Sequence, residues 1–555
     1  MPQYGFLFPS KGSKSTTKTT PQSRPLPGRE MVQNDAGGFV FPLGRWPSLR
    51  RALILGTAEW SYYIGRKEMT DRFLALLREC IEEDPDKVAS ELVYAGEGRT
   101  VSHSTVLIAL AVLSTSKDPL AKRNFNELFP QLVRTGSHLY EVLGYIRGLR
   151  GIGRLIKRSF REWLTRDPGK LAYQLLKYQQ RYGWAARDVF RMFRPVPPTK
   201  EHQELYRWVV KGWDDLPAEA PCEALKQVWW FEWLKRYGTA EEGATVAAIE
   251  KGNLTHEMTT GVGKMDPAAW EALFWRMPAH ATLRNLGSLT DIGVISMENG
   301  PVIERLKNMF LDREAIRKTR LHPVEFMKAL GVYRDGGARG RSKKSWSPVG
   351  TVIDILESAL ELSFETLEPT GKEFLHAVDV SGSMGSFMES CFCTCCEAAA
   401  AMCLVTVKAE RNYEVRGFSS STGSINWGRS GDMNGFVPLG ISREDTFRSA
   451  AGKALMNNFG ATDASLPWRW ARETRKAPDV VVFWTDNETW AGAEHPSVAK
   501  ARLEQQLGRP VKGVYVAMTA SNISLADPKD EHCIDIAGFD PSVPKVIQMF
   551  VAGEI

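Results

Sequence analysis

Two hydrophobic patterns divide the chain. Through residues 31–365, apolar side chains recur every three or four positions between Gly, Pro or Asp, which predicts helix after helix and no strands. The clearest such segments are Thr70–Asp84, Ser104–Ser116, Asn124–Leu143, Leu171–Tyr182, Pro217–Tyr237, Pro267–Met277 and Pro301–Arg317. Helix pairs without a strict sequence period favour an α-solenoid of HEAT-like pairs, with an irregular helical domain as the alternative.

Residues 366–555 carry short, continuous apolar runs instead. Phe374–Val380 and Val480–Trp484 predict strands buried on both faces of a parallel sheet, and therefore a Rossmann-like α/β domain. Each run leads into polar residues, at the edge where open α/β sheets bind ligands. The Ala- and Cys-rich stretch 385–409 predicts a helix packed closely on this sheet.

The first run ends in Asp379-x-Ser381-x-Ser383, while Thr462 lies in a Gly-x-Thr-Asp sequence and Asp486 follows the second run. A carboxylate and two hydroxyls on a tight loop can turn their oxygens toward one point, as a hard cation such as Mg²⁺ requires. The alternative is that these side chains only cap helix N-termini.

Together the three loops resemble the metal-ion-dependent adhesion site of von Willebrand factor A (vWA) domains. The resemblance implies that Ser381, Ser383 and Thr462 coordinate Mg²⁺ or another divalent cation directly or nearly so. It also implies that Asp379 and Asp486 orient ligands or bound waters.

Length and composition fit a multidomain protein, since 555 residues exceed what one core usually supports. Residues 1–30 carry Lys, Ser, Thr, Pro and Gly without a signal-peptide core, so we expect a disordered tail and a cytoplasmic protein. We expect no membrane segment.

Five of the eight cysteines crowd into one stretch, at Cys391, Cys393, Cys395, Cys396 and Cys403. A helix packed closely on a sheet accounts for them. Zinc or disulfide chemistry is the weaker alternative, because no second Cys-x-x-Cys or Cys/His pair lies nearby in the sequence.

Positive charge is concentrated in the amino-terminal part. Residues 366–555 hold 18 Lys and Arg against 23 Asp and Glu, which leaves 53 against 42 for residues 1–365. Between Arg147 and Lys200, 14 basic residues meet three acidic ones. The basic residues at helical spacing beside aromatic ones are Arg154, Lys157, Arg158 and Arg161. Such a face suits phosphate contacts, with a plain solvated surface as the alternative.

A more specific resemblance covers the chain from about Phe41 to the C-terminus. The stretch Leu176–Trp184, with Glu97–Thr100 and Lys211–Trp213, resembles the TROVE domain of the Ro autoantigen family. That family joins a ring of HEAT-like helical repeats to a vWA domain in this order. The chain is identified as a bacterial-type member, with a tail at 1–30, the ring at 31–365 and the vWA domain at 366–555.

The resemblance implies RNA binding rather than catalysis. Ro proteins bind small noncoding Y RNAs on the outer basic surface of the ring and single-stranded 3′ ends of misfolded RNAs in its hole, in noncoding RNA quality control. Bacterial relatives tether the exoribonuclease polynucleotide phosphorylase through a Y RNA. Lys177 and Arg181 match Y RNA-contacting positions, one turn apart on one helical face, and Arg194 stands where well-studied members carry His. Closure of the ring within one chain favours a monomer.

Two readings from other classes remain open. An enzyme using Mg²⁺ for phosphoryl transfer or RNA cleavage would need a Walker A loop or a cluster of acidic residues, and the sequence offers neither. A protein-interaction scaffold based on the vWA domain would not need the basic peak. We therefore expect a binding protein and not an enzyme.

Overall fold

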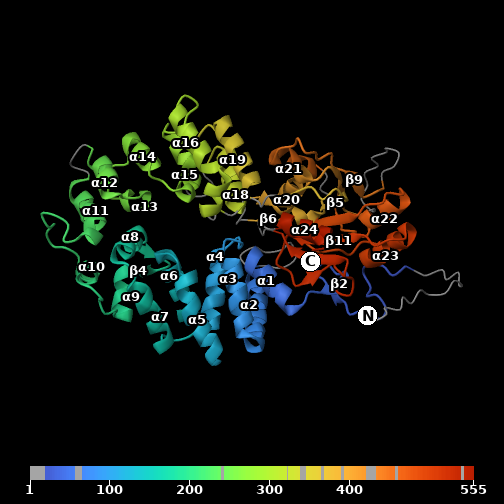
Figure 1. Cartoon of the computed structure of the whole chain (residues 1–555), viewed down its shortest axis with the longest axis horizontal. Helices are drawn as coiled ribbons and strands as arrows, with labels where there is room; N and C mark the ends of the chain where they lie inside the picture. Colours follow the sequence, from blue (N-terminus) through green and yellow to red (C-terminus); the bar gives the residue numbers. More distant parts are fainter. Residues whose placement is uncertain are drawn as a thin grey trace.

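The computed structural model describes residues 19–56, 66–238, 243–319, 321, 323–337, 345–363, 368–388, 393–420, 433–456, 460–538 and 543–554, with the backbone alone at 66–67, 323–324 and 387–388. The chain forms a long helical region that turns back on itself and a compact α/β domain that joins its two ends (Figure 1). No helix in these ranges is long and apolar enough to cross a membrane.

The helical region has HEAT-like helices packed side by side around an elongated ring (Figure 1). Its helices are α1 Arg45–Leu55, α2 Arg66–Glu83, α3 Pro85–Gly96, α4 His103–Leu113, α5 Pro119–Leu132, α6 Gly136–Leu149, α7 Arg154–Leu164, α8 Pro168–Lys177, α9 Ala186–Phe193, α10 Lys200–Lys211, α11 Lys226–Tyr237, α12 Ala244–Gly252, α13 His256–Thr259, α14 Pro267–Phe274, α15 Ala279–Asp291, α16 Gly300–Phe310, α17 Arg313–Thr319, α18 Pro323–Arg334 and α19 Gly350–Leu362. A short 3-10 turn, Glu223–Leu225, precedes α11.

The prediction of uninterrupted helices was wrong at three places. In the segment Pro217–Tyr237, α11 begins only at Lys226, after the 3-10 turn. The segment Asn124–Leu143 is divided between α5 and α6, because the Thr135 hydroxyl accepts from the backbone N–H of His138 at 3.2 Å and caps a new helix. The helix expected to reach Tyr182 ends at Lys177, and a hairpin of β3 Gln180–Arg181 and β4 Trp184–Ala185 follows.

The expected absence of strands before residue 365 was also wrong, as this hairpin shows. In addition, β1 Val32–Gln33 and β2 Phe39–Pro42 form a three-stranded sheet with β12 Ile523–Ser524, which belongs to the α/β domain. Apart from the four-residue β2, these strands have two residues each, which is below the length at which alternation can be recognised in a sequence.

The α/β domain has a six-stranded sheet in the order β13-β11-β10-β5-β8-β9. The strands are β5 Glu373–Asp379, β8 Asn412–Phe418, β9 Phe436–Pro438, β10 Val480–Thr485, β11 Lys512–Ala517 and β13 Cys533–Ala537. All pair in parallel except β9, which is antiparallel to β8. Both predicted buried runs are therefore central, neighbouring strands.

Helices cover both faces of this sheet. Their bounds are α20 Cys395–Ala409, α21 Phe447–Leu455, α22 Leu466–Glu473, α23 Pro496–Leu507 and α24 Val543–Ala552. Val480 and Val482 of β10 share a core with α20, whereas Val481 and Phe483 face α22 and α23. This alternation explains why the strand is apolar at every position.

The helix predicted at 385–409 begins ten residues later than expected. A 3-10 turn at Gly382–Gly385 and a small hairpin of β6 Phe387–Met388 and β7 Cys393–Thr394 come first. Thr394 and Glu397 then form a capping box that starts α20. The expected domain boundary at 365/366 falls among residues 364–367, outside the described part of the chain.

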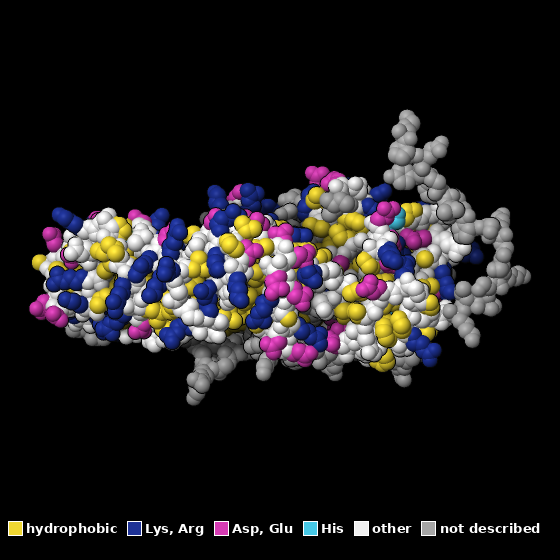
Figure 2. Space-filling view, turned by 90° about the horizontal axis from the view of Figure 1, so that it is seen from below, with side chains coloured by type: hydrophobic (Ala, Val, Ile, Leu, Met, Phe, Trp, Pro, Cys, Tyr) yellow, Lys and Arg dark blue, Asp and Glu magenta, His cyan; other side chains and the backbone are white. Residues whose placement is uncertain are grey.

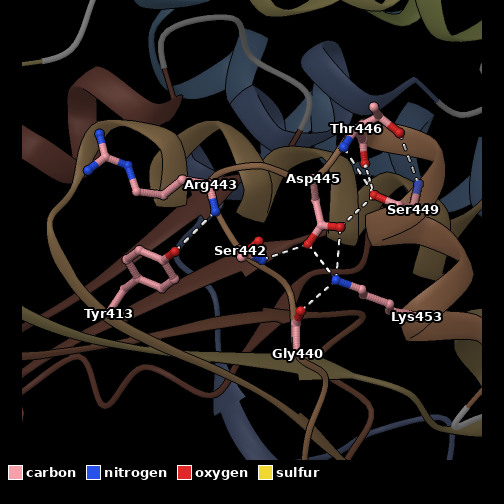
Figure 3. A network of polar contacts seen from close by, with 8 residues as sticks. All are labelled: Tyr413, Gly440, Ser442, Arg443, Asp445, Thr446, Ser449 and Lys453. Atoms are coloured by element: carbon pink, nitrogen blue, oxygen red, sulfur yellow. Dashed lines mark hydrogen bonds and ion pairs between the residues drawn. The ribbon is translucent and has the colours of Figure 1, made fainter.

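Figure 3 shows how the segment before α21 is fixed. The carboxylate of Asp445 accepts from the Ser442 backbone N–H at 2.7 Å and from the Ser449 hydroxyl at 2.6 Å. It also accepts from Lys453, whose ammonium lies 2.7 and 2.8 Å from the two carboxylate oxygens and donates to the Gly440 carbonyl at 2.6 Å. Burial raises the pKa of Asp445, but the hydrogen bonds from Lys453 and Ser449 outweigh this effect and lower the pKa overall. The carboxyl is therefore held charged.

Candidate functional site

The predicted metal-binding loops meet at the carboxyl edge of the sheet. Asp379 ends β5 and Asp486 directly follows β10, and these two strands pair in parallel. The second loop reaches them through Gly460, whose carbonyl accepts from the Gly382 N–H at 3.1 Å. All five predicted site residues, including Ser381, Ser383 and Thr462, are at least 95% buried.

Hydrogen bonds orient the oxygens of these loops. Asp379 accepts from the Ser381 N–H at 2.9 Å with one carboxylate oxygen and from the Thr485 hydroxyl at 2.7 Å with the other. The hydroxyls of Ser381 and Ser383 lie 3.1 Å apart. Asp486 accepts from the Glu488 N–H at 3.0 Å. The first loop therefore presents a carboxylate and two hydroxyls together.

The electrostatics of this site fit a cation. Burial raises the pKa of both Asp379 and Asp486, and the neighbouring Asp486 raises that of Asp379 further. A divalent ion would offset both effects, because its positive charge stabilises the ionised form of both carboxyl groups. Within the described ranges, no three or more His, Cys, Asp and Glu side chains converge on a metal position, so hydroxyl oxygens would have to complete the ligand set.

The cysteine cluster is packed inside the α/β domain. Cys393, Cys395, Cys396 and Cys403 are buried, and Cys391 lies outside the described residues. Burial raises the pKa of the Cys396 thiol to about 12, so this thiol is an inert packing group.

The predicted basic face is present on α7. Arg154, Lys157, Arg158 and Arg161 are exposed, whereas the aromatic residues between them point into the core. Arg187 and Arg191 of α9 are also exposed. Figure 2 shows many Lys and Arg side chains over this end of the ring, with Asp and Glu gathered nearer the middle. The helical spacing thus separates a charged outer face from a packed inner one.

Arg194 follows α9 in a left-handed backbone conformation, with φ of 46°. The preceding carbonyl, that of Phe193, accepts from the Arg161 Nε at 2.7 Å. Arg161 therefore fixes the end of α9. Its Nε–H is used inside the protein, so only the rest of its guanidinium group can contact RNA.

The placement of Lys177 and Arg181 on one helical face was wrong. Lys177 is the last residue of α8, and Arg181 lies in β3 of the hairpin. Tyr182 and Gly183 form the two-residue turn, with φ of 52° and 78°. Arg181 is exposed, but Lys177 is largely buried and pairs with Glu257.

The tail assignment needs a similar correction. Residues 1–18 lie outside the described part, but residues 19–30 have a defined place beside the predicted metal-binding loops. Gln22 is fully buried and donates to the Asp463 carboxylate at 2.8 Å. The polar composition of this segment suggested disorder, whereas its polar groups bind other parts of the chain.

Comparison with known proteins decides the family. The TROVE domain model matches residues 32–227 and 255–369, and the Ro60 vWA domain model matches residues 373–551. The chain belongs to the Ro family.

Ro-family relatives match almost the whole chain. A Deinococcus radiodurans protein named RNA-binding protein RO60 is 32% identical over 547 residues, which cover 96% of this chain and 98% of the relative. A Caenorhabditis elegans protein of the same name is 30% identical over 610 residues, covering 94% and 90% respectively. The crystal structure of the D. radiodurans RO (RSR) protein matches with a TM-score of 0.66 and 28% identity, over 92% of this chain and 100% of that chain.

Several residues at the site were not predicted from the sequence. Thr485 was not assigned a role, although its hydroxyl donates to Asp379. Gln22 and Asn34 carried no recognisable signal, because their partners are far away in the sequence. The turn glycine Gly183 could have revealed the hairpin, since a residue with positive φ followed by Gly is typical of two-residue turns.

Proposed function

We propose that this Ro-family protein is an RNA-binding ribonucleoprotein component that binds phosphates on the outer face of α7 and α9. The observation that carries the proposal is the exposed row of Arg154, Lys157 and Arg158. Exposed guanidinium and ammonium groups contact phosphates irrespective of sequence. The printed names of the relatives, RNA-binding protein RO60, support the same function.

The proposal extends to the kind of RNA. Small structured Y-type RNAs would lie on this outer face, and single-stranded 3′ ends of misfolded RNAs would enter the ring. A ring too narrow for a duplex selects RNAs with free ends, so misfolding itself becomes the signal for quality control. An exoribonuclease such as polynucleotide phosphorylase would then act on the held RNA, and the ring protein would act as a monomer without catalysing a reaction itself.

We further propose that the vWA loops hold Mg²⁺ or a similar hard cation. Ser381, Ser383 and Thr462 would supply oxygens, with Asp379 and Asp486 orienting them and neutralising charge. A bound cation could accept a carboxylate from a protein partner. The carboxylates nearest to this cation belong to residues 366–555, which carry excess negative charge. The basic face lies in the other, helical part of the chain.

Recovery of the protein from cells and sequencing of the copurifying RNA tests the RNA proposal. We expect structured small RNAs with the wild type and their loss when Arg154, Lys157 and Arg158 are replaced by Ala. In gel shifts, an RNA with a single-stranded 3′ tail should bind far better than its blunt-trimmed form. Recovery of proteins without RNA would favour the scaffold reading, and equal binding of tailed and blunt RNA would exclude end recognition.

A further inference from the structure

The segment 19–42, here called the N-terminal clamp, lies directly on two of the metal loops. Its central contact is the carboxamide of Gln22, which is fully buried. The amide nitrogen donates to the carboxylate of Asp463 at 2.8 Å and to the carbonyl of Glu494 at 2.8 Å, and the amide oxygen accepts from the hydroxyl of Thr489. Every hydrogen-bonding atom of this amide group is therefore used between the second and third loops.

Those two loops also touch each other at the same place. The carbonyl of Thr462 accepts from the Trp490 N–H at 3.1 Å and the Ala491 N–H at 3.0 Å, and the Gln22 N–H donates to the Gly492 carbonyl at 2.8 Å. A Cβ at Gly492 would overlap both the Gln22 amide and the Asp463 carboxylate. The contact is thus a close fit that leaves no room for a side chain or an intervening water.

A second part of the clamp binds the third loop beyond Asp486. The Asn34 amide donates to the Thr489 carbonyl at 2.9 Å, and the Ala36 N–H donates to the Glu488 carboxylate at 3.0 Å. A Cβ at Gly38 would overlap the Thr489 carbonyl oxygen. This part of the clamp therefore holds the third loop at two adjacent residues, Glu488 and Thr489.

We infer that Gln22 is a positioning residue for the cation site, through the loop residues adjacent to Thr462 and Asp486. Gln22 binds Asp463, which follows Thr462 directly, and Thr489, which lies three residues after Asp486. A shift of either loop would therefore displace an oxygen donor. Gln22 itself is not a ligand. The inference rests on the proposed cation site and adds to it a dependence on the N-terminal segment.

The test measures Mg²⁺ and Mn²⁺ affinity of the full chain by titration calorimetry. Gln22→Met keeps the volume of the side chain but removes its hydrogen bonds. Gln33→Met is the matched control: it makes the same change in the clamp, at an exposed residue whose amide donates to Gly37 of the same segment. Loss of groups that orient metal ligands typically weakens metal affinity about 10- to 100-fold, so we expect that loss for Gln22→Met and none for Gln33→Met.

Hydrogen exchange of the Trp490 and Ala491 amides, measured without metal, provides a second readout. We expect faster exchange in Gln22→Met than in the wild type or Gln33→Met, at temperatures where all three are folded. Unchanged cation affinity together with unchanged exchange would overturn the inference. If the wild type bound no divalent cation, the cation site and the role of Gln22 would both be refuted. RNA binding by the same proteins tests the RNA proposal separately.

Discussion

The ammonium of Lys177 lies 3.5 Å from a carboxylate oxygen of Glu257, and this ion pair joins α8 to the neighbouring α13. The Lys177 side chain is 16% exposed, and its ammonium also donates to the Tyr173 hydroxyl at 3.4 Å. Burial lowers the pKa of Lys177, but Tyr178 and Glu257 outweigh this effect and raise it, so the residue stays charged. Lys177, which was expected to contact RNA, is therefore engaged in an ion pair with Glu257 within the protein.

We predict that Arg181→Ala weakens structured-RNA binding more than Lys177→Ala does. Arg181 is exposed and free to meet a phosphate, whereas Lys177 would first have to leave Glu257. Lys177→Ala should instead reduce the free energy of unfolding, by about 1 kcal/mol for a partly exposed pair. Filter binding and urea denaturation of both variants check this. A larger loss of RNA affinity in Lys177→Ala would mean that the ion pair opens readily.

For the α7 face, we predict that replacing Arg154, Lys157 and Arg158 by Ala lowers the salt dependence of RNA binding. Each lost phosphate contact should reduce the slope of log K against log salt by about 0.9, if the duplex DNA value applies to RNA. Titration at several salt concentrations measures the slope. Lys529→Ala, an exposed charge on the vWA domain, serves as the control and should leave the slope unchanged.

The vWA site should be separable from RNA binding. We predict that Asp379→Ala abolishes Mg²⁺ binding, because it removes a carboxylate that a hard cation needs, while RNA affinity stays within about twofold. Calorimetry with Mg²⁺ and gel shifts with an RNA whose own fold is independent of Mg²⁺ check the two parts. Loss of RNA binding on chelation would place the cation in the RNA interface instead.

A pair of stacked histidines should make the protein acid-sensitive. The rings of His103 and His138 lie 4.4 Å apart between centroids, and burial lowers the pKa of His138 to about 3 and also lowers that of His103. Below a pH of about 6.5 the unfolded chain takes up protons that the folded chain does not, so stability falls as the pH falls.

At pH 5 the contribution from His138 alone should reach about 2 kcal/mol, which follows from about 1.4 kcal/mol per pH unit. His138→Phe keeps a ring against His103 and removes this titration. We therefore expect the variant to lose less stability than the wild type between pH 7.5 and pH 5 in urea denaturation. Parallel pH profiles for the two proteins would contradict the prediction.

Local patterns predicted the parts of the fold and site that depend on neighbours in the sequence. The strand ending at Asp379 and the loop carrying Ser381 and Ser383 are continuous in the chain, so their chemistry was readable. The hairpin at Gln180–Ala185 was not, because its short strands resemble the end of the helix before them. The hydrogen bond between Gln22 and Asp463 spans 441 positions, and neither residue carries a pattern that indicates the other.

One hydrophobic cluster passes from the helical region into the α/β domain without a break. It includes Phe326 of α18 and Leu356 of α19 as well as Ala398 of α20 and Val480 of β10. Proteolysis or truncation near residue 365 would separate the two family domains. It would also divide this shared hydrophobic cluster. The second half of the ring and the vWA domain should accordingly melt in one transition, although separate family models match them.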